Sequence, residues 1–116
     1  MTGPRSYPKA ARLRRRGEFL SLQREGRRSH TAHLVVIRRP GSGAVSRLGV
    51  TVSTRVGNAV VRNRIKRLLR EVFRQRRADL SPPTDLVVIA KPGADTLTYA
   101  QAATEFARAL QLPPAG

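Results

Sequence analysis

The sequence contains no cysteine and no tryptophan among its 116 residues. Without cysteine, neither a disulfide framework nor a cysteine-based zinc site can form. Acidic residues are also scarce: Asp and Glu number 7 against 23 Lys and Arg, which leaves a formal net charge of +16. With this net charge, the positive side chains repel one another in the folded state and attract anionic surfaces. Nucleic acid is therefore the first class of partner that the composition indicates, and an anionic membrane is the second.

Long apolar runs are missing as well. No segment reaches the length of a membrane span, and the amino terminus lacks the apolar stretch of a signal peptide. We therefore expect a soluble, cytoplasmic protein with no membrane partner. Hydrophobic residues still make up 40% of the chain, more than a disordered basic tail carries. We expect a single domain over residues 1–116, preceded at about 1–11 by a flexible basic arm.

The most informative segment is a basic stretch over residues 62–73, whose apolar residues recur with the period of an α-helix. Its apolar residues recur at steps of three and four and share one stripe, namely Ile65, Leu68, Leu69, Val72 and Phe73. Asn63, Arg67 and Arg70 project from the opposite side. Like charges four residues apart, such as Lys66 with Arg70, destabilise a helix unless a partner relieves them, and Glu71 is the only acid nearby. A helix with a core-facing stripe and a cationic face is thus predicted, and it requires a polyanion.

The remaining pattern predicts an α+β sandwich. Helices are expected at about 18–24, 59–77 and 99–110, and strands at 33–38, 48–53 and 85–91, with one further short strand left open. The order strand, helix, strand over residues 48–91 is compatible with a parallel pair. Asn58 is a plausible N-cap of the basic helix, and Thr98 with Gln101 forms a capping box for the last helix.

No group of residues supports catalysis by the protein alone. His30 and His33 are the only histidines, and their spacing does not place them on one face of a strand. The acids are scattered, with no close pair for a metal site. Taken by themselves, Thr51 and Ser53 indicate the wet face of a half-covered sheet, and Phe19 indicates a core contact of the first helix.

The segment from Leu48 to Glu71 closely resembles the bacterial ribonuclease P protein subunit. Its most specific signature is Arg62-Asn63-Arg64, followed by Lys66-Arg67 and Arg70-Glu71, and the likeness extends roughly from Lys9 to Leu110. The resemblance implies a two-layer sandwich with about four strands in a mixed sheet, three helices and a left-handed β-α-β crossover. It also implies a ribonucleoprotein that removes the 5′ leader from precursor tRNA. The RNA subunit and the Mg²⁺ bound to it would perform the hydrolysis, with no metal bound by the protein alone and no obligate protein partner.

The resemblance also assigns roles to residues. Those expected to bind the RNA subunit are Arg55, Arg62, Asn63, Arg64, Lys66, Arg67 and Arg70. Those expected to bind the leader, between the first helix and the sheet, are Phe19, Ile37, Thr51, Ser53 and Lys91. The family often has further aromatic residues where this chain has Gln23, Val35 and Ile37. Leader contacts here would then depend more on arginine and apolar packing, which leaves the preferred leader sequence open.

Two other classes of protein share part of this pattern. A general RNA-binding or ribosomal protein would carry the same charge, but it would have no reason to carry the Arg-Asn-Arg-x-Lys-Arg register. A self-sufficient nuclease would cleave RNA with no RNA subunit present.

Overall fold

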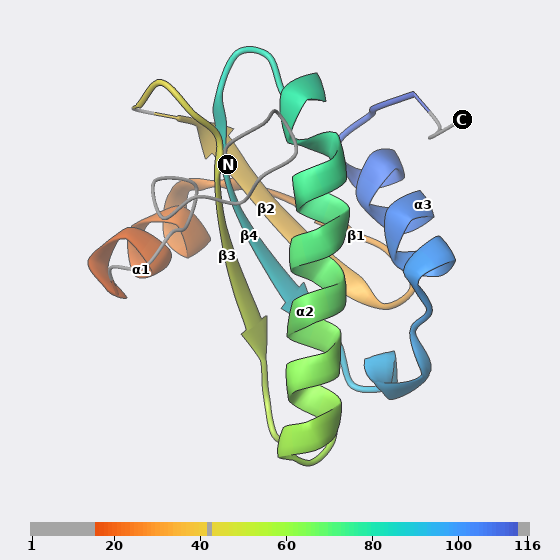
Figure 1. Cartoon of the computed structure of the whole chain (residues 1–116). Helices are drawn as coiled ribbons and strands as arrows, with labels where there is room; N and C mark the ends of the chain where they lie inside the picture. The colour runs from red at the N-terminus through yellow and green to blue at the C-terminus, as the bar shows by residue number, and fades with distance from the viewer. Residues whose placement is uncertain (1–15, 42, 114–116) are drawn as a thin grey trace, which may run out of the picture.

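The computed structural model describes residues 16–41 and 43–113. Within these ranges the chain forms three α-helices, two short 3₁₀ helices and four strands (Figure 1). In chain order the elements are α1 (Arg16–Glu25), β1 (Arg27–His30), β2 (Leu34–Pro40), β3 (Arg47–Val52), α2 (Ala59–Arg76), η2 (Arg77–Asp79), β4 (Thr84–Ala90), η3 (Ala94–Thr96) and α3 (Tyr99–Ala109). The basic arm expected at 1–11 lies outside the described residues.

The four strands form one mixed sheet in the order β1-β2-β4-β3. β2 is antiparallel to both β1 and β4, whereas β3 and β4 are parallel and are connected through α2. The predicted α+β class, the mixed four-stranded sheet and the three helices are confirmed. The left-handed sense expected for the β3-α2-β4 crossover stays a prediction.

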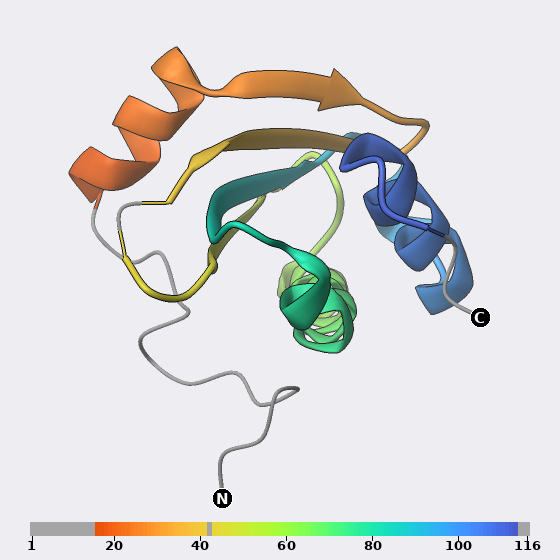
Figure 2. The same ribbon diagram turned by 90° about the horizontal axis from the view of Figure 1, so that it is seen from above.

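Helices cover the sheet unequally. α2 and α3 lie on one face, and α1 lies on the other, toward one end of the sheet (Figure 2). The larger core fills the α2–α3 side; its bulkiest fully buried members are Leu34, Leu48, Ile65, Leu69, Phe73, Leu86, Leu97 and Phe106. A smaller cluster lies under α1 and consists of Leu22, Val35, Ile37 and Val87, with Phe19 and Ile89 packed against it. The sheet and the α2–α3 pair form the expected two layers, to which α1 adds a partial third.

α2 forms as its sequence predicts. Asn58 caps the helix, because its side-chain oxygen accepts the amide of Val61 at 3.0 Å. The helix expected over about 59–77 ends at Arg76, and Arg76 falls on the buried stripe. Two of its three guanidinium nitrogens have partners there, because Nε donates to Asp79 Oδ2 at 2.7 Å and Nη2 donates to the carbonyl of Pro113 at 2.7 Å, whereas Nη1 is buried without a hydrogen bond. The helix can therefore bury a cation at its last turn.

The predicted capping box of α3 is confirmed: Thr98 Oγ1 accepts the Gln101 amide at 3.2 Å, and the Gln101 side chain accepts the Thr98 amide at 3.0 Å. Tyr99 falls at helical spacing with Ala103, Phe106 and Leu110, which predicts a buried side chain, but this prediction is wrong because Tyr99 is 43% exposed. On α3 the first buried residue is Ala102, so the first turn of the helix lies outside the core.

Candidate nucleic-acid interface

Four side chains on the solvent side of α2 form what we call the α2 ridge: Asn63, Lys66, Arg67 and Arg70. At about 100° per residue they fall within a narrow sector opposite Ile65 and Leu69. All four line one surface hollow, together with Glu71 and Arg74. Within the described residues, the side chains of these four residues make no hydrogen bond or ion pair. The ridge is thus a row of cations that the fold itself does not neutralise.

The two outer arginines of the signature lie on opposite flanks of the ridge. Arg62 is half-buried, and its Nε donates to the carbonyl of Gly57 at 3.2 Å. Arg64 donates from Nη1 to the carbonyl of Leu97 at 3.2 Å and from Nη2 to the carbonyl of Asp95. The guanidinium of Arg64 therefore holds the η3 turn against α2. Its role in RNA binding stays a prediction, to which the structure adds this contact with the η3 turn.

Glu71, the one acid of the signature, forms hydrogen bonds with neighbouring residues of its own helix. Its carboxylate accepts Arg74 Nε at 2.9 Å and Gln75 Nε2 at 2.9 Å. The hydrogen bond from Arg74 is the main cause that lowers the pKa of Glu71 to about 2, and the same pair raises the pKa of Arg74. Glu71 therefore remains ionised beside Arg74 and does not pair with the α2 ridge. Arg55, also expected to contact RNA, is exposed in the turn before α2.

On the α1 side of the sheet, directly paired residues form rows across the strands. The row under α1 runs through Arg28, Ile37, Val87 and Gly49. Phe19 of α1 lies on Gly49, because a Cβ at that glycine would come within 2.3 Å of the Phe19 Cζ atom. Only glycine lets the ring approach the strand so closely. Phe19 is therefore both a packing residue of α1 and a half-exposed aromatic edge beside the sheet.

The prediction that Ile37 contacts the leader is not supported by its position. Ile37 is completely buried, at 0% exposure, beneath α1. A Cβ at Gly26, the residue that ends α1, would lie 2.5 Å from the Ile37 Cγ2 atom. Strand alternation places Ile37 on the correct face, but α1 covers that part of the face.

The next row is less completely covered than the row under α1, and we call it the open row: His30, Val35, Ile89 and Thr51. Thr51 and Ile89 are half-buried, while Val35 retains 9% exposure. Ser53 follows on the same side and is exposed. Val35 and Ile89 are thus the apolar residues of the open face that sequence reasoning did not select. Hydrophobic alternation identifies their face, but it does not show how far α1 reaches along the sheet.

Lys91 stands where β4 ends, at the edge of the open row. Its ammonium donates to the carbonyl of Thr31 at 2.6 Å, and its amide donates to the carbonyl of His33 at 2.8 Å. A lysine ammonium has three donors, so two remain for a ligand. The structure thereby brings four of the predicted leader residues, Phe19, Thr51, Ser53 and Lys91, to one face of the sheet.

The turn that holds Lys91 is itself fixed to α3 by Glu105. Glu105 is 7% exposed, and Oε1 accepts the Thr31 hydroxyl at 2.6 Å and the His33 amide at 2.8 Å. Its other oxygen lies 2.6 Å from His33 Nδ1. Burial alone would raise the pKa of Glu105, but the hydrogen bonds from His33 and Thr31 lower it below its usual range. The carboxylate is therefore ionised, and it anchors the β1–β2 turn.

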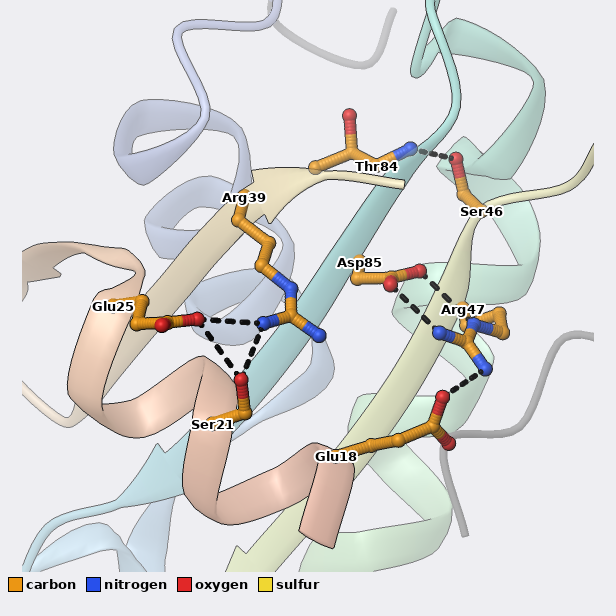
Figure 3. Close-up of polar contacts among 8 residues, drawn as sticks. All are labelled: Glu18, Ser21, Glu25, Arg39, Ser46, Arg47, Thr84 and Asp85. Carbon is orange, nitrogen blue, oxygen red and sulfur yellow. Dashed lines mark hydrogen bonds and ion pairs between the residues drawn. The ribbon is translucent and has the colours of Figure 1, made fainter. Parts of the chain in front are cut away.

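A second set of arginines joins α1 to the sheet (Figure 3). Arg47 meets Asp85 in a bidentate pair, with Nε to Oδ1 at 3.0 Å and Nη2 to Oδ2 at 2.8 Å, and its Nη1 donates to Glu18 at 2.9 Å. Arg39 donates to Ser21 at 2.8 Å and to Glu25 at 3.3 Å. These contacts place α1, and with it Phe19, over the sheet. The sequence offers no spacing signal for them, because the partners lie far apart in the chain.

Within the described ranges, no helix combines the length and apolarity that a membrane crossing requires. The same residues contain no group of three or more His, Cys, Asp or Glu side chains placed to hold a metal ion.

The family model described as Ribonuclease P matches residues 7–112. The chain is 47% identical over 104 residues to the ribonuclease P protein component of Citrifermentans bemidjiense, covering 90% of this chain and 89% of that protein. It is 51% identical over 89 residues to the component of Desulfatibacillum aliphaticivorans, covering 77% and 75% respectively.

Solved structures agree with the sequence comparisons. The RNase P protein of Staphylococcus aureus superposes with a TM-score of 0.79 at 31% identity, covering 89% of this chain and 94% of that one. The RNase P protein of Thermotoga maritima gives a TM-score of 0.77 at 28% identity, with 88% and 97% covered. The chain belongs to the bacterial ribonuclease P protein family: it is a component of the endoribonuclease that processes the 5′ end of tRNA, and its partner is the ribonuclease P RNA.

Proposed function

We propose that the α2 ridge is the surface that docks on the ribonuclease P RNA. The observation that supports this most strongly is the row of three cations, Lys66, Arg67 and Arg70, left without partners on a helix whose only acid is engaged by Arg74. Phosphates would relieve the repulsion along the row, and guanidinium groups suit bidentate phosphate contacts. Asn63 stands among them, and its amide can both donate and accept toward a base or a ribose. Arg62 and Arg55 extend the contact on its flank.

We propose further that the 5′ leader of precursor tRNA lies along the open row beside α1. Val35 and Ile89 offer an apolar floor for bases, and the half-exposed edge of Phe19 borders it. Thr51 and Ser53 supply hydroxyl groups at one side, while Lys91 supplies two ammonium donors for a phosphate at the other. Base stacking on an aromatic ring contributes about 1–3 kcal/mol per base, so Phe19 is expected to dominate this contact.

In this proposal Mg²⁺ is held mainly by the RNA subunit and supplies the hydrolytic chemistry there. The chain's own carboxylates support that assignment, because six of them are engaged in ion pairs within the described residues. The protein's part is to dock, through the α2 ridge, and to hold the leader.

The leader proposal is tested by binding of the reconstituted holoenzyme to precursor and mature tRNA. Phe19→Leu keeps apolar bulk over Gly49 but removes the ring. We expect it to weaken binding of precursor tRNA about tenfold, the effect of losing roughly 1.4 kcal/mol of stacking, and to leave mature tRNA unaffected.

Tyr99→Leu is the matched control, since it removes an exposed aromatic ring on α3, away from the open row. Equal losses for precursor and mature tRNA in Phe19→Leu would show that Phe19 serves only to pack α1. A precursor-specific loss in Tyr99→Leu would place the leader on another surface.

A further inference from the structure

A second hollow lies at the sheet edge opposite β3, between β1, β2 and the end of α3. Its volume is about 490 Å³, and three arginines and a histidine line it: Arg27, Arg38, Arg108 and His30. These side chains come from three different elements. None of them belongs to the α2 ridge, and only His30 belongs to the open row. We call this set the edge cluster.

The edge cluster holds like charges that the fold brings together. Arg27 is directly opposite Arg38 in the antiparallel pair of β1 and β2. Side chains of directly opposed residues lie on the same face with Cβ atoms about 4.5–5.5 Å apart, and like charges placed so are destabilising. Arg38 gains some relief, because its Nη1 lies 3.4 Å from the carbonyl of Leu110 at the end of α3. This contact does not account for Arg27.

Within residues 16–41 and 43–113, no carboxylate pairs with the other members. The side chains of Arg27 and Arg108 make no hydrogen bond or ion pair within the described residues. Six of the carboxylates pair with groups outside the edge cluster. The seventh, Asp95, lies in η3, before α3, whereas Arg108 lies in the last turn of that helix. An external anion bound among these arginines would therefore relieve their repulsion.

The edge cluster is continuous with the end of the proposed leader site. Thr31 lines the hollow, and the carbonyl of the same residue accepts the ammonium of Lys91 at 2.6 Å. Beyond the cluster, Arg27 and Arg38 also line a neighbouring hollow of about 430 Å³ with Pro82 and Thr84. The cations thus follow a track that starts at Lys91 and runs along the β1–β2 edge.

We propose that this track binds the phosphodiester backbone of the leader upstream of the nucleotides that lie on the open row. The proposal rests on the leader-binding function proposed above and extends it to a second, purely electrostatic segment. Because the track offers guanidinium groups and no aromatic ring, it reads backbone charge and not base sequence. Long leaders gain affinity from it, and short leaders do not reach it.

The test uses the reconstituted holoenzyme and two precursor tRNAs, with leaders of about 4 and about 16 nucleotides, the range of site sizes of a single-strand-binding fold. The variant is Arg27→Ala with Arg108→Ala. For the long leader, the slope of log affinity against log salt should become shallower by about 1.4, or about 0.7 for each lost single-strand contact. For the short leader, the slope should match that of the unmodified protein.

Arg16→Ala with Arg24→Ala is the matched control, because it also removes two positive charges, both from exposed positions on α1 outside the edge cluster. An unchanged slope for the long leader would overturn the proposal. Equal changes for both leaders would also overturn it, because they would place the edge cluster on the RNA subunit or the tRNA body. Phe19→Leu measured in parallel reports separately on the open row, so failure of the track and failure of the leader site are distinguished.

Discussion

Arginines occupy two regions of this molecule under opposite conditions. Where α1 meets the sheet, Arg39 and Arg47 face carboxylates of Glu18, Glu25 and Asp85 (Figure 3). On the α2 ridge, Lys66, Arg67 and Arg70 face solvent without a carboxylate partner in the described part of the chain.

The contrast separates two uses of the same chemical group. Asp85 is 1% exposed, so its charge depends on the bidentate contact with Arg47, and the pair raises the pKa of Arg47. The ridge cations cost little desolvation and repel one another, which leaves them available for an external polyanion. The net charge of +16 therefore includes two groups of basic residues: arginines that stabilise the fold through ion pairs, and cations of the α2 ridge that are available to bind RNA.

The largest expected effect comes from the buried pair. Arg47→Met leaves Asp85 buried without a partner, and we expect a loss of about 3–5 kcal/mol in the free energy of unfolding, measured by urea denaturation. Arg70→Met, the matched change on the ridge, should stay within about 0.5 kcal/mol. Similar losses in both variants would remove the distinction between the two regions.

Removing the ridge should affect RNA binding while leaving the fold intact. Lys66→Ala, Arg67→Ala and Arg70→Ala combined are expected to weaken binding to the ribonuclease P RNA. The salt slope should flatten by about 2–3, since each contact contributes about 0.7–0.9. Filter binding over a salt series measures the slope, and urea denaturation checks the fold. A steep slope that persists in the triple variant would show that another surface meets the RNA.

Arg64→Ala sharpens the comparison within α2 itself. The guanidinium of Arg64 donates to the carbonyls of Asp95 and Leu97. We expect this variant to lose about 1 kcal/mol of stability through these hydrogen bonds. Its salt slope for RNA binding should remain that of the unmodified protein, and a slope flattened as in a ridge variant would return Arg64 to the RNA-binding set.

The smallest effect concerns Glu71. Its folded pKa, about 2, lies below its ordinary value, so the stability it contributes is present above that ordinary value and is lost as pH falls toward 2. The side chain is 42% exposed, which limits the gain to about 0.5 kcal/mol. Glu71→Gln should thus be slightly less stable than the unmodified protein at pH 7 and equal to it near pH 2, as measured by urea denaturation. A difference that grows on acidification would contradict this assignment.

Most of the fold could be predicted because its elements carry strong periodic signals. The stripe from Ile65 to Phe73, the apolar run of β4 and the capping box at Thr98 each specify an element by local chemistry. β1 could not be placed, because Arg27–His30 shows no apolar alternation. That strand exists through backbone pairing with β2, a tertiary effect that overrides local propensity.

The sequence predicted on which face of the sheet the site residues lie, but not how deeply α1 buries them. Alternation placed Thr51 on the face that α1 partly covers, but it did not show that Ile37 is completely buried beneath α1. The reach of α1 depends on contacts such as Arg47 with Glu18, which join residues distant in the chain and leave no spacing pattern. Within the signature helix, the helical period shows which residues point outward, but only the packing of η3 reveals that Arg64 is already engaged.

The central claim, that placement and not total charge determines RNA binding, is tested most directly by one paired measurement. Arg70→Ala and Arg39→Ala each remove a single positive charge, one from the α2 ridge and one from the pair with Glu25. We predict that Arg70→Ala flattens the salt slope of binding to the ribonuclease P RNA by about 0.9, whereas Arg39→Ala leaves it unchanged. Equal flattening in the two variants would show that net charge alone governs the contact, and would contradict the account.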